Sequence, residues 1–197
     1  MGRRRFWWGW FFAALYFALK SRGVLFWKKP NLDVVQLDPM AIEIKPAPAE
    51  FGDWEALMAL LHAAFAFQHS RIDPPSSLHR FDAKSIAVKA KEEQLFLALD
   101  GGELVGCIFA KPQAGALHVG KMAVRPGRQG QGIGRRLMQA AEGMARKSGL
   151  GLLELETRVE LTENHAAFAA MGFVNVSEGM HPGYDRTTSI TMRKTLG

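Results

Sequence analysis

The sequence predicts an α/β fold in which helices flank a mixed β-sheet. Apolar runs of strand length alternate with amphipathic helical segments along most of the chain. The pair Asp100-Gly101 lies between two such apolar runs, which is typical of a β-hairpin. A glycine-rich loop at 127–134 leads from an apolar run into a long helical segment, which favours a sheet packed against helices. The length of 197 residues suits one domain with enough core to fold unaided.

The first part of this domain is predicted to contain one strand and two helices. Residues 42–45 alternate apolar and charged side chains, as a strand does. Residues 49–68 carry apolar side chains at spacings of three and four, which indicates an amphipathic helix. Pro74 and Pro75 exclude a helix from the segment that follows. A second helix is predicted at 77–91.

The rest of the domain is predicted from apolar runs and glycine caps. The predicted elements are, in order, strands at 94–99, 103–110 and 117–124, a helix at 132–148, a strand at 150–157, a helix at 164–171, and strands at 173–176 and 189–193. Gly149 and Gly172 follow the two helices, where glycine commonly ends a helix. The element order is therefore β-α-α-β-β-β-α-β-α-β-β.

The basic character of the chain comes from its N-terminal segment. The net charge is +6 and the sequence pI is about 9.7. Residues 1–30 hold seven Lys and Arg and no acidic residue, so residues 31–197 hold 18 basic and 19 acidic side chains. The predicted domain therefore lacks the positive charge that attracts a polyanion, and we expect no nucleic-acid partner.

Residues 1–39 are predicted to be separate from a domain at 40–197. The uncharged aromatic run from Phe6 to Leu19 is shorter than the roughly 20 residues that span a bilayer. Three interpretations are open: a non-native or disordered extension upstream of a start at Met40, a membrane-surface anchor formed by residues 1–30, and an export signal. No small-x-small cleavage site follows the run, and we prefer the first interpretation.

The single cysteine indicates the compartment. Cys107 lies in the apolar run 104–109, which predicts a buried and inert thiol. No disulfide can form within the chain, and this suits a reducing compartment. We therefore expect a cytoplasmic protein.

The loop at 127–134 is predicted to bind an anion. Unpaired N–H groups and the helix dipole favour negative charge where a helix begins. Arginines suited to phosphate oxygens flank the loop, at Arg125, Arg128, Arg135 and Arg136. A Walker loop is excluded because Gly134 is followed by Arg135, and the dinucleotide fingerprint fails because its third glycine would fall on Arg135. A tight turn without a ligand is the alternative.

A third pattern fits this loop in full. Gln129-Gly130-Gln131-Gly132-Ile133-Gly134 matches Arg or Gln, two residues of any type, Gly, one residue of any type, then Gly or Ala. The match resembles the acyl-CoA-binding motif of the GNAT acetyltransferase superfamily. Phe168 to Phe173 is similar to the late helix-to-strand segment of that family, which ends in Gly-Phe. With the element order, the resemblance covers about residues 41–195.

The resemblance implies a GNAT-like, mostly antiparallel sheet and direct acetyl transfer from acetyl-CoA to an amine, without a metal. The loop amides would hold the CoA pyrophosphate. The strand before the loop would splay from the next strand, so that the pantetheine arm lies between them. The residues expected to bind CoA are Met122, Val124, Arg128, Gln129, Gly130, Gln131, Gly132, Ile133, Gly134, Arg135, Asn164 and Phe168.

The catalytic residues depart from the family pattern. Phe168 stands where the family often has a tyrosine that acts as the general acid, and Leu161 stands where it has an Asn. Asn164 is a candidate for the CoA contact of that missing Asn. Tyr184 is a candidate acid, with a loop anchor as its alternative reading and proton donation by water as the alternative mechanism.

Several side chains are candidate bases. His118 and Glu156 are preferred because they lie on the strands expected to splay, and the others are Glu154, His165 and His181. Attack through a water chain without a dedicated base is the alternative. Arg71 and Arg158 are candidates to face the acceptor pocket, with surface salt bridges as the alternative for both.

The resemblance implies a small-molecule or protein amine as the acceptor, and we expect a monomer or homodimer as the assembly. Two rival functions remain. The first is a catalytically weak acyl-CoA-binding module, which is suggested by Phe168 at the position of the family's tyrosine. The second is a membrane-surface protein that works through residues 1–30.

Overall fold

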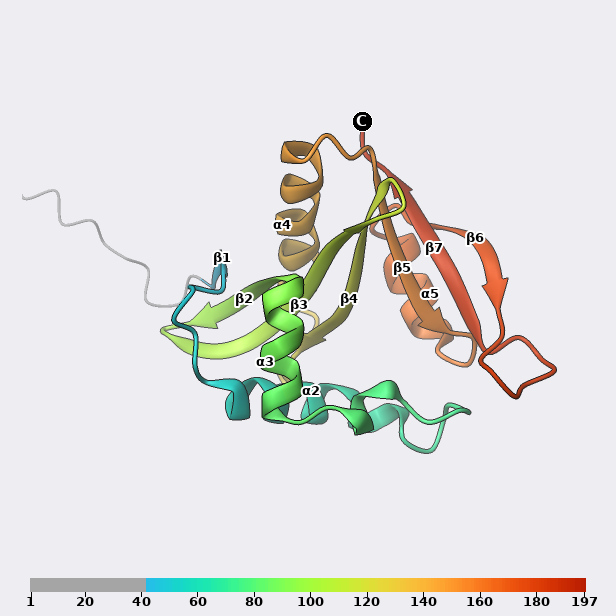
Figure 1. The fold of residues 1–197 in the computed structure, drawn as a ribbon, viewed down its shortest axis with the longest axis horizontal. Helices are drawn as coiled ribbons and strands as arrows, with labels where there is room; N and C mark the ends of the chain where they lie inside the picture. The colour runs from blue at the N-terminus through green and yellow to red at the C-terminus, as the bar shows by residue number, and fades with distance from the viewer. Residues whose placement is uncertain (1–41) are drawn as a thin grey trace, which may run out of the picture. The chain divides into compact units, whose positions relative to one another are not determined.

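Seven strands form one mixed sheet in the computed structural model, which describes residues 42–197 (Figure 1). The predictions for residues 1–39 lie outside the described residues. The elements are β1 (Glu43–Pro46), α2 (Trp54–Phe65), the 3₁₀ helices η1 (Ala66–Gln68) and η2 (Ser77–Arg80), α3 (Ala83–Glu92), β2 (Gln94–Asp100), β3 (Glu103–Gln113), β4 (Ala116–Val124), α4 (Ile133–Lys147), β5 (Leu152–Arg158), α5 (Thr162–Ala169), β6 (Val174–Gly179) and β7 (Ser189–Thr195).

The order of the strands in the sheet is β1-β2-β3-β4-β5-β7-β6. Within the described residues, β4 and β5 are the only parallel neighbours, and every other pair is antiparallel. The predicted α/β class, the mostly antiparallel sheet and the order of strands and α-helices are confirmed.

Two predicted helices are shorter than expected. The helix predicted at 49–68 begins at Trp54, where Asp53 accepts a hydrogen bond from the amide of Ala56, and it becomes a 3₁₀ turn after Phe65. The prediction of one helix at 77–91 was wrong. Asp82 and Ser85 form a capping box with bonds of 2.7 and 2.8 Å, which starts a new helix after the 3₁₀ turn η2.

Helices cover both faces of the sheet. α2 and α3 pack on one face, over a core that includes Leu57, Leu61 and Phe109. On the other face, α4 packs over a core that includes Ile108 and Leu137. Figure 1 shows α4 and α2 on opposite sides of β2 to β4. None of the helices among the described residues is long and apolar enough to cross a lipid bilayer.

Cys107 on β3 is fully buried, as predicted. Burial penalises the thiolate and raises the pKa of the thiol to about 12. The thiol is therefore held in its neutral, inert form.

A β-bulge shapes the centre of the sheet. Where β4 pairs with β3, Gly120 is opposite Phe109 and Ala123 is opposite Cys107. Between these two pairs, β4 therefore has one residue more than β3. The extra residue lies at Lys121–Met122, and Lys121 has a φ of +46°, which is rare for a residue with a Cβ. A bulge of this kind bends its strand and disrupts the ladder.

The parallel ladder between β4 and β5 is short. The paired residues are Leu117 with Leu153 and His118 with Glu154, and no further pair forms between the two strands in the described part of the chain. From Val119 onward the strands diverge, and Figure 1 shows them close at one end and far apart at the other. The splay therefore begins just before the bulge.

Candidate active site

Two cavities lie along the end of β4 that is not paired with β5. The first has a volume of about 630 Å³ and is bounded by the glycine loop. The second has a volume of about 290 Å³ and extends along β5. They share five lining residues, which are Phe65, Gln68, Met122, Asn164 and Phe168. The two cavities therefore form one cleft, and they join beside the bulge of β4.

The glycine loop presents free backbone donors to the larger cavity. Gly130 and Gly132 have φ values of +75° and +77°, which a residue with a side chain rarely adopts. Gly132 is the N-cap of α4 and supplies no capping side chain, so the first-turn N–H groups of α4 are left for another acceptor. A Cβ at Gly132 would meet no protein atom within 4 Å, which leaves the space before the helix open. This arrangement fits a phosphate group.

Three of the four flanking arginines are engaged in holding the fold. Arg128 pairs with Asp100, Arg125 pairs with Glu103, and Arg136 donates to the carbonyl of Ile42. Arg135 lines the larger cavity, and its guanidinium makes no hydrogen bond within residues 42–197. Arg135 is therefore the arginine best placed to meet an anion at the start of α4.

Most of the residues predicted to bind CoA line the cleft. Eleven of the twelve do so, and Gln131 is the exception. Its side-chain amide donates to the carbonyl of Gly127 over 3.4 Å. Phe168 lines both cavities and packs edge to face on Phe173, with 6.0 Å between ring centroids. The tyrosine position of the family is thus filled by a ring that can neither donate nor accept a proton.

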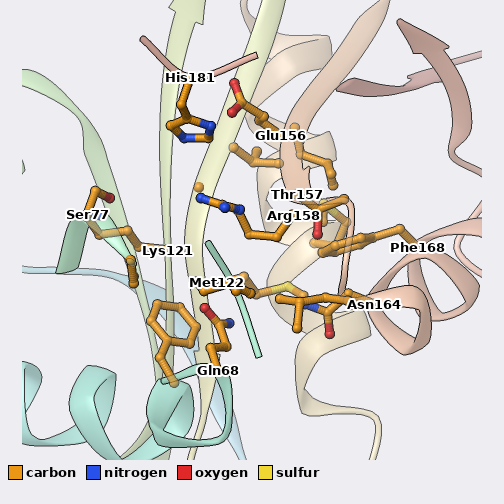
Figure 2. Close-up of a pocket in the computed structure, with 18 residues that line it drawn as sticks. Gln68, Ser77, Lys121, Met122, Glu156, Thr157, Arg158, Asn164, Phe168 and His181 are labelled. Atoms are coloured by element: carbon orange, nitrogen blue, oxygen red, sulfur yellow. The ribbon is translucent and has the colours of Figure 1, made fainter. Parts of the chain in front are cut away.

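The smaller cavity is the polar end of the cleft. Its lining includes Glu156, Thr157 and Arg158 from β5, Lys121 from β4, and His181 from the loop after β6 (Figure 2). Glu156 is exposed and therefore reaches solvent. This end can accept a polar substrate and can exchange protons with bulk water.

Arg158 lies inside this polar end. Its side chain is 13% exposed, and Figure 2 shows the guanidinium reaching from β5 across the opening toward β4. Nε lies 3.6 Å from Oε2 of Glu160, which is an ion-pair distance and too long for a hydrogen bond. Nε and Nη2 are buried, and neither has a hydrogen-bond partner within residues 42–197.

His181 also faces the cleft, and Thr188 holds its ring in place. The hydroxyl oxygen of Thr188 lies 2.9 Å from the backbone nitrogen of His181 and 2.6 Å from Nδ1. The ring is thereby held through Nδ1, and Nε2 is the ring nitrogen that is left to face a ligand.

The candidate base His118 and the candidate acid Tyr184 line neither cavity. His118 lies in the paired part of β4 and β5, with Nδ1 3.9 Å from Glu154. Tyr184 donates its hydroxyl proton to Asp73. Of the candidate bases, the structure brings Glu156 and His181 into the cleft, with Asn164 and Phe168.

The other candidates are divided in the same way. Glu154 is bonded to Arg193 over 2.7 Å, and Nε2 of His165 lies 2.8 Å from the carbonyl oxygen of Arg158, to which it donates. Arg71 forms two bonds to Glu163, of 2.5 and 2.9 Å, and lines neither cavity. For Arg71 the surface salt bridge holds, whereas Arg158 faces the cavity as proposed from the sequence.

Sequence reasoning passed over Lys121 and Gln68, although both line the cleft. Burial lowers the pKa of the Lys121 ammonium to about 8, and its Nζ lies 4.4 Å from the centroid of the Phe81 ring. Each carried a signal in the sequence. Lys121 is a charged residue inside an apolar strand, and Gln68 continues the apolar face of α2 three residues after Phe65.

Known proteins share this architecture. A family model described as the acetyltransferase (GNAT) family matches residues 54–173. A protein of Azospirillum brasilense named IAA acetyltransferase is 34% identical over 104 residues, which are 52% of this chain and 67% of that protein.

Two solved structures show the same fold. The PaiA N-acetyltransferase of Thermoplasma acidophilum, in complex with coenzyme A, has a TM-score of 0.65 and 18% identity over 80% of this chain and 100% of its own. The ribosomal-protein-S18-alanine N-acetyltransferase from Escherichia coli has a TM-score of 0.59 and 20% identity, over 79% of this chain and 94% of its own. At these identities the likeness is one of fold.

Proposed function

The chain belongs to the acetyltransferase (GNAT) family and is an acyltransferase, and from this premise we propose that it moves an acetyl group from acetyl-CoA to an amine by direct attack. The acceptor is a small-molecule or protein amine. The reaction takes place in the cytoplasm, and the free, buried Cys107 agrees with a reducing compartment.

The continuity of the cleft carries this proposal. Uncapped N–H groups of α4 lie at one end, the polar residues of β5 lie at the other, and Met122 borders both cavities. A ligand with a diphosphate at the helix start can therefore extend along β4 toward a second ligand beside Glu156. The edge of β4 beyond His118 has no strand partner from β5, which leaves its backbone groups available to orient such a ligand.

The residues of the polar end support the proton transfers. The amine must lose a proton before it attacks, and Glu156 is in reach of both the cavity and solvent. The departing thiolate has a pKa near roughly 8.5, by analogy with cysteine, so water can protonate it without a strong acid. This fits the presence of Phe168 where a tyrosine would otherwise stand. Loss of the acid therefore does not argue against turnover.

The test is turnover of acetyl-CoA by the purified chain with a panel of amines. The panel contains free amino acids, polyamines, aminoglycosides and peptides with free N-termini. Release of free thiol follows the rate, and mass spectrometry of the acetylated product identifies the acceptor. The proposal expects acetyl-CoA consumption that depends on an acceptor, and a Glu156→Gln chain that is slowed by on the order of 10²-fold at unchanged acetyl-CoA affinity.

Other outcomes would point to the rival functions. Binding of acetyl-CoA in a calorimeter without turnover of any amine, including amines of a cell extract, would indicate an acyl-CoA-binding module. Flotation with liposomes that requires residues 1–39 would indicate that the N-terminal segment works at a membrane surface. The two measurements are independent, so each rival can be rejected separately.

A further inference from the structure

The guanidinium of Arg158 is an incompletely satisfied cation in the polar end of the cleft. Two of its three nitrogens are buried without a hydrogen-bond partner in the described part of the chain. Buried guanidinium groups are normally paired and hydrogen-bonded, because an unpaired buried charge is unfavourable. The nearest carboxylate, that of Glu160, lies 3.6 Å from Nε, which is too far for a hydrogen bond.

Glu160 is itself directed elsewhere. Its Oε1 accepts a hydrogen bond from the amide of Asp73 over 3.2 Å and lies 3.7 Å from Nη1 of Arg186. The charge of Glu160 is therefore shared between two arginines and the backbone of another loop. The positive charge of Arg158 is therefore only partly neutralised, and a second anion in the cavity can pair with it.

The surroundings of Arg158 favour an anion. Lys121 and Arg158 are cations in the lining of the smaller cavity, and Glu156 is the single carboxylate among the residues that line it. His181 also lines this cavity, and its Nε2 is left to face a ligand because Nδ1 is bonded to Thr188. Arg158 and His181 come from different elements, β5 and the loop after β6, and Figure 2 shows both side chains beside the same opening.

Arg158 is also held in place. Its carbonyl oxygen accepts from the amide of Leu161 over 3.2 Å and from Nε2 of His165 over 2.8 Å. Its backbone pairs with Ser189 of β7. A planar guanidinium on a fixed backbone is preorganised for the two parallel hydrogen bonds that a carboxylate accepts.

We propose that the acceptor amine carries a carboxylate, and that Arg158 binds this carboxylate in the smaller cavity while the amine faces Glu156. The substrate class is then a free amino acid or a similar small amino carboxylate. The volume of about 290 Å³ suits a ligand of this size and is small for a folded protein segment. The inference rests on the proposed acetyl transfer, since it names the acceptor of the same site.

The first experiment compares acceptors that differ only at the carboxylate. Each amino acid is paired with its carboxamide and with the amine that lacks the carboxyl group. The carboxylate form is expected to have a kcat/KM higher by roughly 10–100-fold, as for the loss of a charge-assisted hydrogen bond. Equal values for the acid and the carboxamide would overturn the inference and leave the acetyl transfer intact. Acetylation restricted to peptides or proteins would overturn the assignment to a small molecule.

The second experiment removes the cation. Arg158→Gln is expected to bring the ratio of acid to carboxamide near one, and Arg158→Lys is expected to retain part of it because the charge remains. Arg193→Gln is the matched control, since Arg193 is an exposed arginine on β7 that is paired with Glu154 outside the cleft. An unchanged ratio in a folded Arg158→Gln chain would refute the proposal. Thermal melting and acetyl-CoA affinity report whether that chain is folded.

A third measurement does not depend on turnover. The N-acetylated amino acid is titrated into the chain in the presence of CoA, and binding is followed by calorimetry. Arg158→Gln is expected to weaken this binding at least about tenfold, whereas the Arg193→Gln chain is expected to match the parent. An affinity that is the same in the parent and the Arg158→Gln chain would overturn the inference even if no acceptor were acetylated. Failure of turnover with Arg158-dependent binding would instead count against the proposed acetyl transfer alone.

Discussion

The hydroxyl of Tyr184 donates a hydrogen bond to Oδ1 of Asp73 over 2.6 Å. The same carboxylate accepts from Nη2 of Arg186 over 2.8 Å at Oδ2. The bond to Tyr184 and the charge of Arg186 hold the pKa of Asp73 below its usual range, and the partnership with Asp73 raises the pKa of Tyr184. Two loops that are 111 residues apart in the chain are thereby joined outside the cleft.

Tyr184→Phe is therefore expected to change kcat by less than about tenfold, because general acid help is worth on the order of 10²–10⁴. The substitution removes one exposed hydrogen bond and leaves the lining of the cleft intact. Steady-state kinetics with acetyl-CoA and the best acceptor would measure the effect. A hundredfold loss of kcat at unchanged CoA affinity would mean that Tyr184 reaches the thioester.

Gly132→Asp is expected to lower acetyl-CoA affinity at least about tenfold, or about 1.4 kcal/mol. Its side chain would enter the open space at the start of α4 with a negative charge. Gly149→Asp is the control, because Gly149 has a similar φ of +70°, with no atom within 4 Å of a Cβ, and follows the opposite end of the helix. Both chains carry the same backbone strain. Isothermal calorimetry in which the two lose affinity equally would refute the phosphate site.

Lys121→Met is expected to raise the free energy of unfolding by about 1–2 kcal/mol at pH 7, after allowance for partial exposure. The pKa of Lys121 is about 8 in the folded chain and 10.5 ordinarily, so burial of the charged form costs stability below pH 8. Between about pH 8 and 10.5 the unfolded chain binds more protons, and stability rises with pH. The Met variant should lose this rise.

Urea unfolding at a series of pH values measures the effect, with Lys111→Met as the control. Lys111 is a lysine on β3 whose side chain is 42% exposed. A Lys121→Met chain that is less stable than the parent at pH 7 would show that the ammonium on the Phe81 ring contributes more than its desolvation costs.

A chain that begins at Met40 is expected to melt cooperatively and to bind acetyl-CoA as the full chain does. Residues 42–197 supply a core on each face of the sheet. The family model likewise begins at residue 54. Aggregation of the shorter chain, or loss of its acetyl-CoA affinity, would show that residues 1–39 contribute to the domain.

The elements whose signals are local were predictable from the sequence. The hairpin of β2 and β3 follows from Asp100-Gly101 between apolar runs, and the start of α4 follows from the glycine loop. The break in the helix predicted at 77–91 was missed because Asp82 caps through Ser85, a pair outside the usual Glu or Gln pattern. Helix starts are set by such single hydrogen bonds, which periodicity does not record.

The polar end of the cleft was harder to predict, since it is built from distant segments. Arg158 was a candidate, but its incomplete pairing depends on the direction of the Glu160 side chain. That direction depends in turn on the contacts of Glu160 with Asp73 and Arg186. The position of the splay was also hidden. His118 was preferred as a base because it lies on a splaying strand, yet the strands separate only after it.

The bulge at Lys121–Met122 means that a single extra residue in β4 contributes to the opening of the cleft. Without it, Cys107 would face Met122 in the register that Phe109 and Gly120 set, and β4 would continue straight beside β3. The bend that a bulge adds to its strand would then be absent, and the parallel ladder could extend into the space that the smaller cavity occupies. A sheet sealed along its centre and a sheet that admits a substrate thus differ by a single-residue insertion. The left-handed backbone at Lys121 is the conformational cost of that opening.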